Sequence, residues 1–237
     1  MQTAIVTGAS SGIGRAVSHM LVKKGFYVYG FGRTFPQDEV SGFNGYVPVC
    51  GDITELGWLQ EQVRRIRREK TVSLLVNNAG VGYFGLHEEL NAKKIHEMVT
   101  VNVEVPLVLT QLLLRDLKRC SGTIVNISSI TAKKTNPHGC AYGATKAAIS
   151  SFSASLFEEA RKYGVRVTTI HPDMTASGFY RNANFCQAPE ADCHLRPEEV
   201  AFAVEQVLDT RQGIAVTDVV LRPQKHRIIR KGEKTYD

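Results

Sequence analysis

The sequence is poor in the residues that build disulfide frameworks and metal sites. Its 237 residues hold only five cysteines, an odd number, and no two of them form a Cys-x-x-Cys pair. Small secreted folds and zinc sites depend on paired or closely spaced cysteines. We therefore expect neither disulfides nor a metal site. Unpaired thiols in a chain of this length are typical of the reducing cytoplasm.

Long apolar runs are missing as well. A membrane-spanning helix needs about 18 or more consecutive apolar residues, and the sequence has no such run. The N-terminus also lacks the charged segment and apolar run of a signal peptide. We expect no contact with a membrane.

Basic residues are in modest excess, with 29 Lys and Arg against 23 Asp and Glu and a formal net charge of +6. They gather at residues 64–68 and 222–231. A nucleic-acid interface would need these clusters on one face, with base-reading partners. The first cluster is typical of the solvated side of a helix. The second could equally serve a contact between subunits, so we expect no nucleic-acid partner.

Short apolar segments alternate with longer helical patterns along the chain. Such alternation predicts an α/β fold, in which a parallel sheet of about seven strands is covered by helices on both faces. The expected strands are residues 4–6, 27–31, 46–49, 74–76, 123–127, 165–170 and 214–221, and the expected helices are residues 12–24, 55–69, 91–119, 141–162 and 197–208.

No linker, repeat or low-complexity segment divides the chain, so we expect one domain over residues 1–237. Residues 175–196 break the alternation and are expected to form a long loop over a site. Phe179, Tyr180 and Phe185 would form an apolar lid together with residues 81–86. The alternative is that these side chains pack in the core.

A glycine-rich turn links the first expected strand to the first expected helix. Residues 7–14 read Thr-Gly-Ala-Ser-Ser-Gly-Ile-Gly. Glycines here let the backbone turn tightly and let a pyrophosphate approach without meeting a Cβ atom. The free N–H groups at the helix N-terminus favour an anion. The turn therefore predicts a dinucleotide site.

The glycine spacing, Gly-x-x-x-Gly-x-Gly, is followed by further motifs in a fixed order. They are residues 77–80 (Asn-Asn-Ala-Gly), Asn102, Ser129 and the pair Tyr142-x-x-x-Lys146. Over residues 1 to about 175, the chain resembles the compact single-domain branch of the short-chain dehydrogenase/reductase family. The resemblance implies a Rossmann-type doubly wound sheet and a nicotinamide cofactor. It also implies a homodimer or homotetramer, formed through the helices expected at 91–119 and 141–162.

The end of the second expected strand bears on the choice of cofactor. An acid there binds the ribose 2′-hydroxyl of NAD, whereas an arginine accepts the 2′-phosphate of NADP. Gly32 stands where NAD-preferring members of the family carry the acid, Arg33 follows, and no carboxylate occurs before Asp38. We expect NADP(H) rather than NAD(H). The alternative is that Arg33 is an ordinary surface arginine with no part in cofactor binding.

The resemblance implies further cofactor contacts. Asp52 would bond the adenine amino group, Ile53 would pack on the ring, and Asn78 would line the ribose or pin the sheet. The expected cofactor residues are Gly8, Ser10, Ser11, Gly12, Ile13, Gly14, Arg33, Asp52, Ile53, Asn78, Ala79, Gly80, Tyr142, Lys146, Pro172 and Thr175.

The run after Pro172 departs from the family pattern. Asp173 replaces the usual glycine, and Ser177 takes the position of the usual threonine. Because an aspartate has less backbone freedom than glycine, the local path is expected to differ. The backbone of Thr175 would contact the carboxamide.

Tyr142 and Lys146 are the expected catalytic pair. They lie four residues apart on an expected helix and so share a face. A tyrosine with an ordinary pKa near 10 is a poor acid at neutral pH, and a nearby ammonium lowers that pKa. By the resemblance, Ser129 rather than Ser128 bonds the substrate oxygen, and Asn102 holds a water that relays protons to the lysine.

These residues predict an NADP(H)-dependent oxidoreductase that interconverts a carbonyl and a secondary alcohol on a small molecule, with Tyr142 as general acid and base. Two alternatives remain open. One is a non-catalytic dinucleotide-sensing protein on the same fold. The other is an epimerase or dehydratase that uses the cofactor transiently. Lys133 and Lys134 would favour an anionic substrate, unless they belong to a solvated loop.

Overall fold

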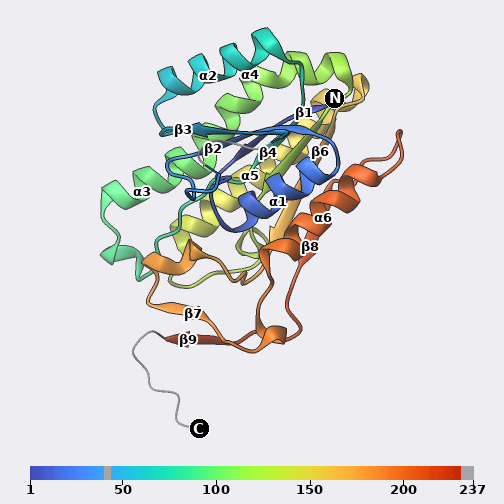
Figure 1. The fold of residues 1–237 in the computed structure, drawn as a ribbon. Coiled ribbons are helices and arrows are strands. Elements are labelled where there is room, and N and C mark those ends of the chain that lie inside the picture. Colours follow the sequence, from blue (N-terminus) through green and yellow to red (C-terminus); the bar gives the residue numbers. More distant parts are fainter. Residues whose placement is uncertain (40–43, 231–237) are drawn as a thin grey trace.

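The computed structural model describes residues 1–39 and 44–230. Its main feature is a seven-stranded sheet in the order β3-β2-β1-β4-β5-β6-β8, with every neighbouring pair parallel (Figure 1). The order reverses between β1 and β4, and ligands bind at such a switch point in open α/β sheets. The strands are β1 (Thr3–Thr7), β2 (Tyr27–Gly32), β3 (Tyr46–Cys50), β4 (Val72–Asn77), β5 (Thr123–Ile127), β6 (Arg166–Pro172) and β8 (Asp218–Leu221).

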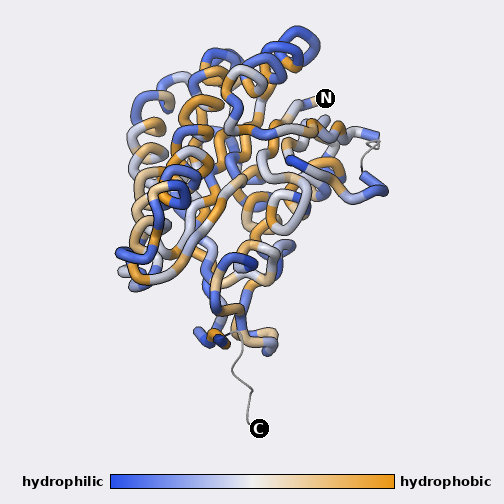
Figure 2. The backbone as a smooth tube through the Cα atoms, turned by 90° about the vertical axis from the view of Figure 1, so that its left-hand side faces the viewer, coloured by the Kyte–Doolittle hydropathy of each residue, from blue (hydrophilic) through white to orange (hydrophobic). Residues whose placement is uncertain are grey.

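Helices cover both faces of the sheet, and each face has its own apolar core. Val17 and Leu21 of α1 share one core with Val200 of α6. Leu59 of α2 and Leu113 of α4 lie in the other. Figure 2 shows apolar segments through the middle of the molecule and polar ones at its turns. The helices are α1 (Gly12–Lys23), α2 (Leu56–Glu69), α3 (Ala92–Val99), α4 (Val105–Cys120), α5 (Cys140–Ala160) and α6 (Pro197–Asp209). The α/β doubly wound sheet predicted from the sequence is thus confirmed.

The helix expected over residues 91–119 is interrupted. A π-helical turn, Thr100–Glu104, separates α3 from α4 and contains Asn102. Such turns are rare and are frequent at functional sites. By length and composition alone, the combined stretch Ala92–Cys120 could cross a membrane. However, its Leu109 and Leu117 are fully buried against the sheet, as in a core helix of a soluble fold.

The C-terminal part differs from expectation in two ways. The strand expected over residues 214–221 begins only at Asp218. Within the loop expected over residues 175–196, β7 (Phe185–Gln187) pairs antiparallel with β9 (Ile228–Arg230), which the sequence did not predict. In Figure 1 this small sheet projects below the main body. Of the basic segment 222–231, residue 231 lies outside the described residues.

Candidate active site

A cavity of about 710 Å³ lies beyond the carboxyl ends of the central strands. It runs from the glycine turn after β1 to Ser129, Tyr142 and Lys146. Two of the expected residues, Gly14 and Asn102, do not line it. The expected residues that do line it are Gly8, Ser10, Ser11, Gly12, Ile13, Arg33, Asp52, Ile53, Asn78, Ala79, Gly80, Ser129, Tyr142, Lys146, Pro172 and Thr175.

The turn after β1 has the conformation that its glycines permit. Gly8 and Gly12 have φ angles of 65° and 53°, in the left-handed region. A Cβ on Gly14 would lie 2.2 Å from the carbonyl oxygen of Gly8 and 2.4 Å from Nδ2 of Asn78. The missing side chain of Gly14 therefore lets α1 pack closely against the turn and Asn78. Gly14 itself does not line the cavity.

Asn78 fastens the end of β4 to the glycine turn. Its Nδ2 donates to the carbonyl oxygen of Thr7 at 2.9 Å and to that of Gly8 at 3.3 Å. The backbone N–H groups of Asn78 and Ala79 both donate to Oγ1 of Thr7, at 3.0 Å. Both readings left open by the sequence therefore have support, since Asn78 pins the sheet and also lines the cavity.

Arg33 and Asp52 line the end of the cavity beside β2 and β3. The N–H and hydroxyl of Thr54 donate to Oδ1 of Asp52, at 2.9 and 2.7 Å, and lower the pKa of its carboxyl group. Asp38 and Glu39 lie outside the cavity lining, and both pair with Arg15, Glu39 at 2.6 Å. Neither carboxylate competes with a ligand for Arg33.

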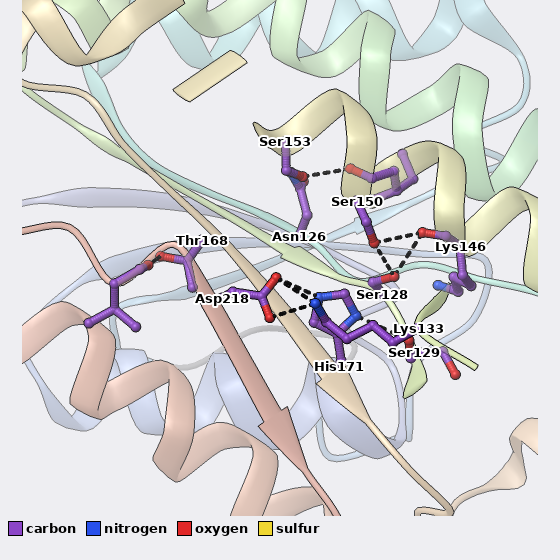
Figure 3. Close-up of polar contacts among 12 residues, drawn as sticks. Asn126, Ser128, Ser129, Lys133, Lys146, Ser150, Ser153, Thr168, His171 and Asp218 are labelled. Atoms are coloured by element: carbon purple, nitrogen blue, oxygen red, sulfur yellow. Dashed lines mark hydrogen bonds and ion pairs between the residues drawn. The ribbon is translucent and has the colours of Figure 1, made fainter. Parts of the chain in front are cut away.

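Tyr142 and Lys146 lie one turn apart on α5 and point to the same place. The Nζ of Lys146 is 5.8 Å from the centroid of the Tyr142 ring and donates to the carbonyl oxygen of Ile127 at 2.9 Å. The hydroxyl of Ser129 bonds that of Tyr142. Ser129 lies just beyond the end of β5, beside His171 (Figure 3). The structure thus brings the three expected groups together.

Burial governs the protonation of this pair. Desolvation raises the pKa of Tyr142 well above its ordinary value, the nearby Tyr180 raises it further, and the bond from Ser129 opposes both. Desolvation also lowers the pKa of Lys146 to about 8. Both groups are shielded from water, which disfavours each charged form. Lys146 is not among the causes that shift the pKa of Tyr142 here, so the expectation that the lysine lowers this pKa stays a prediction.

A lid of four packed rings covers Tyr142. Phe84 lies at its centre, with its ring centroid 5.4 Å from that of Tyr142 and 5.2 Å from that of Phe185. The Phe179 ring lies 5.5 Å from Tyr142 and 5.3 Å from Tyr180. The apolar lid expected from residues 81–86 and 175–196 is present and touches Tyr142.

The Tyr180 hydroxyl is bonded to the backbone N–H of Thr175, a group that the sequence analysis assigned to the cofactor. Burial and the nearby Asp173 nevertheless keep the pKa of this phenol raised. Thr175 itself lines the cavity, as expected. In this arrangement its N–H is turned toward the lid.

Asn102 holds the loop after β4 rather than lining the cavity. Its Oδ1 accepts from the N–H of Val81 at 2.8 Å, and its Nδ2 donates to the carbonyl oxygen of Val81 at 2.9 Å and to Oγ1 of Thr145 at 3.0 Å. A Cβ on Gly80 would lie 3.4 Å from both Oδ1 of Asn102 and Nζ of Lys146. The water relay between these two residues stays a prediction.

Asp173 fits its position without the conformational freedom of glycine. It is not among the residues with positive φ. Its Oδ1 accepts from the N–H of Met174 at 2.9 Å, and its Oδ2 lies 3.5 Å from Nε of Arg222 and 3.8 Å from Nζ of Lys134. These two cations offset the charge that the substitution adds.

The two lysines expected near the substrate are engaged elsewhere. Lys133 pairs with Asp218 at 3.0 Å, and Lys134 lies near Asp173. Neither lines the cavity. The structure therefore gives no support to selection of an anionic substrate by these side chains.

Sequence reasoning missed one polar group behind the site. His171, in β6, lies between Ser129 and Asp218 (Figure 3). The only signal available was a histidine at the end of an otherwise apolar expected strand, just before Pro172.

The comparisons with known proteins agree with this geometry. Residues 2–185 match the family model described as short chain dehydrogenase. An uncharacterized oxidoreductase from Staphylococcus epidermidis is 30% identical over 227 residues, covering 94% of this chain and 97% of that protein.

Solved structures share the fold over nearly the whole chain. An alcohol dehydrogenase from the archaeon Thermococcus sibiricus, complexed with 5-hydroxy-NADP, is 26% identical with a TM-score of 0.84, covering 96% of this chain and 99% of its own. A short-chain dehydrogenase from Streptomyces avermitilis is also 26% identical, with a TM-score of 0.80 and coverage of 92% and 87%.

Proposed function

Because the chain belongs to the short-chain dehydrogenase family and is an oxidoreductase of that family, we propose that it uses NADP(H) to interconvert a carbonyl and a secondary alcohol. The observation that carries the proposal is the pairing of two features in one cavity. At one end, a glycine turn opens onto a helix N-terminus. At the other, Ser129, Tyr142 and Lys146 line the same cavity, with the Lys146 amine 5.8 Å from the centroid of the Tyr142 ring.

The residues that line the cavity fit a dinucleotide. Gly8 and Gly12 leave the helix N-terminus open to a pyrophosphate. Asp52 and Ile53 would hold the adenine, and Arg33 a 2′-phosphate. Lys146 and the backbone of Thr175 would hold the nicotinamide end. When bound, the cofactor supplies the hydride.

The protein's own part is to place and move a proton. The raised pKa of Tyr142 keeps its phenol protonated, so it can donate to the oxygen of a carbonyl under reduction. Ser129 would hydrogen-bond the same oxygen and stabilise its developing charge. Lys146, with a pKa of about 8, can return a proton to Tyr142 near neutral pH. Oxidation of an alcohol is the reverse path.

Two observations support the choice of NADP(H). Arg33 lines the cavity, and the carboxylates nearest to it in the following sequence, Asp38 and Glu39, are paired with Arg15 outside it. The alcohol dehydrogenase from Thermococcus sibiricus was solved with an NADP derivative. The rings of Phe84 and Phe179 beside Tyr142 favour a substrate whose carbonyl carries an apolar group.

The test measures NADPH consumption by absorbance against a panel of aldehydes and ketones. We expect turnover by the natural protein and loss of turnover in Tyr142→Phe, with NADPH binding, followed by fluorescence titration, retained in both. Binding without turnover across the panel would instead favour a dinucleotide sensor. Product formed with no net change in NADPH would favour an epimerase or dehydratase.

A further inference from the structure

His171 is a buried titratable group that the proposed reaction does not use. It has no exposed surface. Its Nδ1 lies 3.1 Å from the backbone carbonyl oxygen of Ser129, and its Nε2 lies 3.1 Å from Oδ2 of Asp218. Figure 3 shows the imidazole between these two groups, on the side of the sheet covered by α5.

Both partners of His171 accept hydrogen bonds and neither donates. A backbone carbonyl has only lone pairs, and so has an ionised carboxylate. The side chain of Asp218 is 45% exposed, and its Oδ1 lies 3.0 Å from Nζ of Lys133. An imidazole satisfies both acceptors only when each of its ring nitrogens carries a proton.

The peptide group bonded by His171 belongs to the serine of the active site. The Ser129 carbonyl also accepts from the N–H of Ala132 at 3.1 Å, and the Ser129 hydroxyl accepts from the N–H of Thr131 at 3.2 Å. The same hydroxyl bonds Tyr142. His171 therefore fixes one side of the residue that faces the reacting oxygen.

We infer that His171, protonated on both ring nitrogens, is a positioning residue that orients Ser129 through its carbonyl group. The kinetic part of this inference rests on the proposed oxidoreductase function, whereas the protonation of His171 does not. Misplacing a catalytic group by about 1 Å can cost on the order of a hundredfold in rate. Losing one of several bonds to Ser129 should cost less.

Other charged groups near His171 must be considered in any dependence on pH. Asp218 is the one in direct contact. The others on the segments packed around it are Lys133 and Lys134 after the 3₁₀ turn Ile130–Ala132, Asp173 at the end of β6, Arg222 after β8, and Lys146 on α5.

The first test observes the ring nitrogens directly. The chain has seven histidines, so protein labelled with ¹⁵N-histidine would be compared with His171→Gln to assign the signals. At pH 7 we expect both nitrogens of His171 to show the shifts of protonated nitrogens. An unprotonated nitrogen would overturn the inference. This test does not depend on turnover, so it stands if no carbonyl substrate is reduced.

The second test swaps donors and acceptors at the same place. A glutamine at position 171 has an NH2 group at one end of its amide and an acceptor oxygen at the other. It can therefore donate to only one of the two acceptors, and its amide oxygen opposes the other. We expect His171→Gln to lower kcat about tenfold without changing the KM for NADPH. Adding Asp218→Asn supplies a donor toward that amide oxygen, and it should restore kcat to within about threefold.

Asp218→Asn alone is the matched control. Its amide can donate to Nε2, so a neutral imidazole then satisfies both partners. We expect this variant to keep a kcat within about threefold of that of the natural protein. Unchanged kcat in His171→Gln, or a double variant no better than the single one at equal thermal stability, would overturn the positioning role.

Discussion

Arg33 is the residue on which the proposed choice of cofactor depends. A charge-assisted hydrogen bond is worth about 1.5–3 kcal/mol, so Arg33→Ala should weaken NADPH binding at least about tenfold. NADH binding, which involves no 2′-phosphate, should change little. Titration of cofactor fluorescence with both nucleotides measures this, and Arg65→Ala, on the exposed side of α2, is the control. Equal losses for both nucleotides would remove the argument for NADP(H).

Lys146 links stability to pH because it is buried. Its pKa is lowered from 10.5 to about 8, so between these pH values the unfolded chain binds more protons than the folded one. The free energy of unfolding should therefore rise as pH increases from about 8 toward 10, by up to the order of 3 kcal/mol.

Above pH 10 the raised pKa of Tyr142 acts in the opposite direction, because the unfolded chain then loses its phenolic proton first. The comparison of urea unfolding at pH 7, 8, 9 and 10 with Lys146→Met isolates the lysine. The rise between pH 8 and 10 should be absent in that variant. An identical slope in both proteins would show that Lys146 is not desolvated.

At the scale of elements, the contact between α1 and the glycine turn depends on one missing side chain. Gly14→Ala would put a Cβ within 2.2–2.4 Å of Gly8 and Asn78, and forcing this overpacking should cost about 1–3 kcal/mol and weaken NADPH binding. Gly57→Ala, in α2, meets nothing within 4 Å and should stabilise by up to about 1 kcal/mol. Thermal unfolding and NADPH titration of both variants check this, and equal behaviour would contradict it.

The lid competes with the cofactor for one backbone group in our proposal. The Tyr180 hydroxyl bonds the Thr175 N–H that would contact the carboxamide. Tyr180→Phe keeps the ring in the lid but frees this N–H, and a hydrogen bond of about 1 kcal/mol corresponds to roughly fivefold tighter NADPH binding. Fluorescence titration measures it, with the half-exposed Tyr163→Phe as control. Weaker binding in Tyr180→Phe would show that the hydroxyl assists the cofactor.

At the scale of the whole molecule, the C-terminal segment supports the lid from outside the main sheet. β9 pairs with β7, the N–H of Ala188 donates to the carbonyl oxygen of Arg227 at 3.2 Å, and the Arg227 guanidinium lies 2.7 Å from Glu190. The two cores on the sheet make no use of this segment. Removal of the C-terminal segment should therefore loosen the lid and leave the stability of the core nearly unchanged.

Truncation after Arg222 tests this separation. We expect protease cleavage within residues 183–196 to speed up and the KM for the carbonyl substrate to rise, while the unfolding temperature changes by only a few degrees. Limited proteolysis, steady-state kinetics and calorimetry measure the three effects. A large fall in unfolding temperature would mean that the segment belongs to the cooperative core. The expected homodimer or homotetramer stays a prediction, which light scattering can test.

Much of the site could be predicted from the sequence because its motifs are local. The glycine turn, the Tyr142-x-x-x-Lys146 pair and Ser129 each combine a short segment with the end of a strand or one face of a helix. Once the alternation of strands and helices predicts a parallel sheet, the carboxyl ends of its strands meet at one edge. The order of these motifs therefore determined which groups would gather, and the structure brings them to one cavity.

Only the tertiary structure decided how those groups behave. Phe84 and Phe179 pack over Tyr142, and the resulting desolvation raises the pKa of its phenol. This desolvation comes from segments that lie far apart in the chain. The bond from His171 to Ser129 and the pairing of β7 with β9 likewise join residues more than 40 positions apart. No spacing in the sequence encodes such contacts, since they follow from how the loops fold back over the sheet.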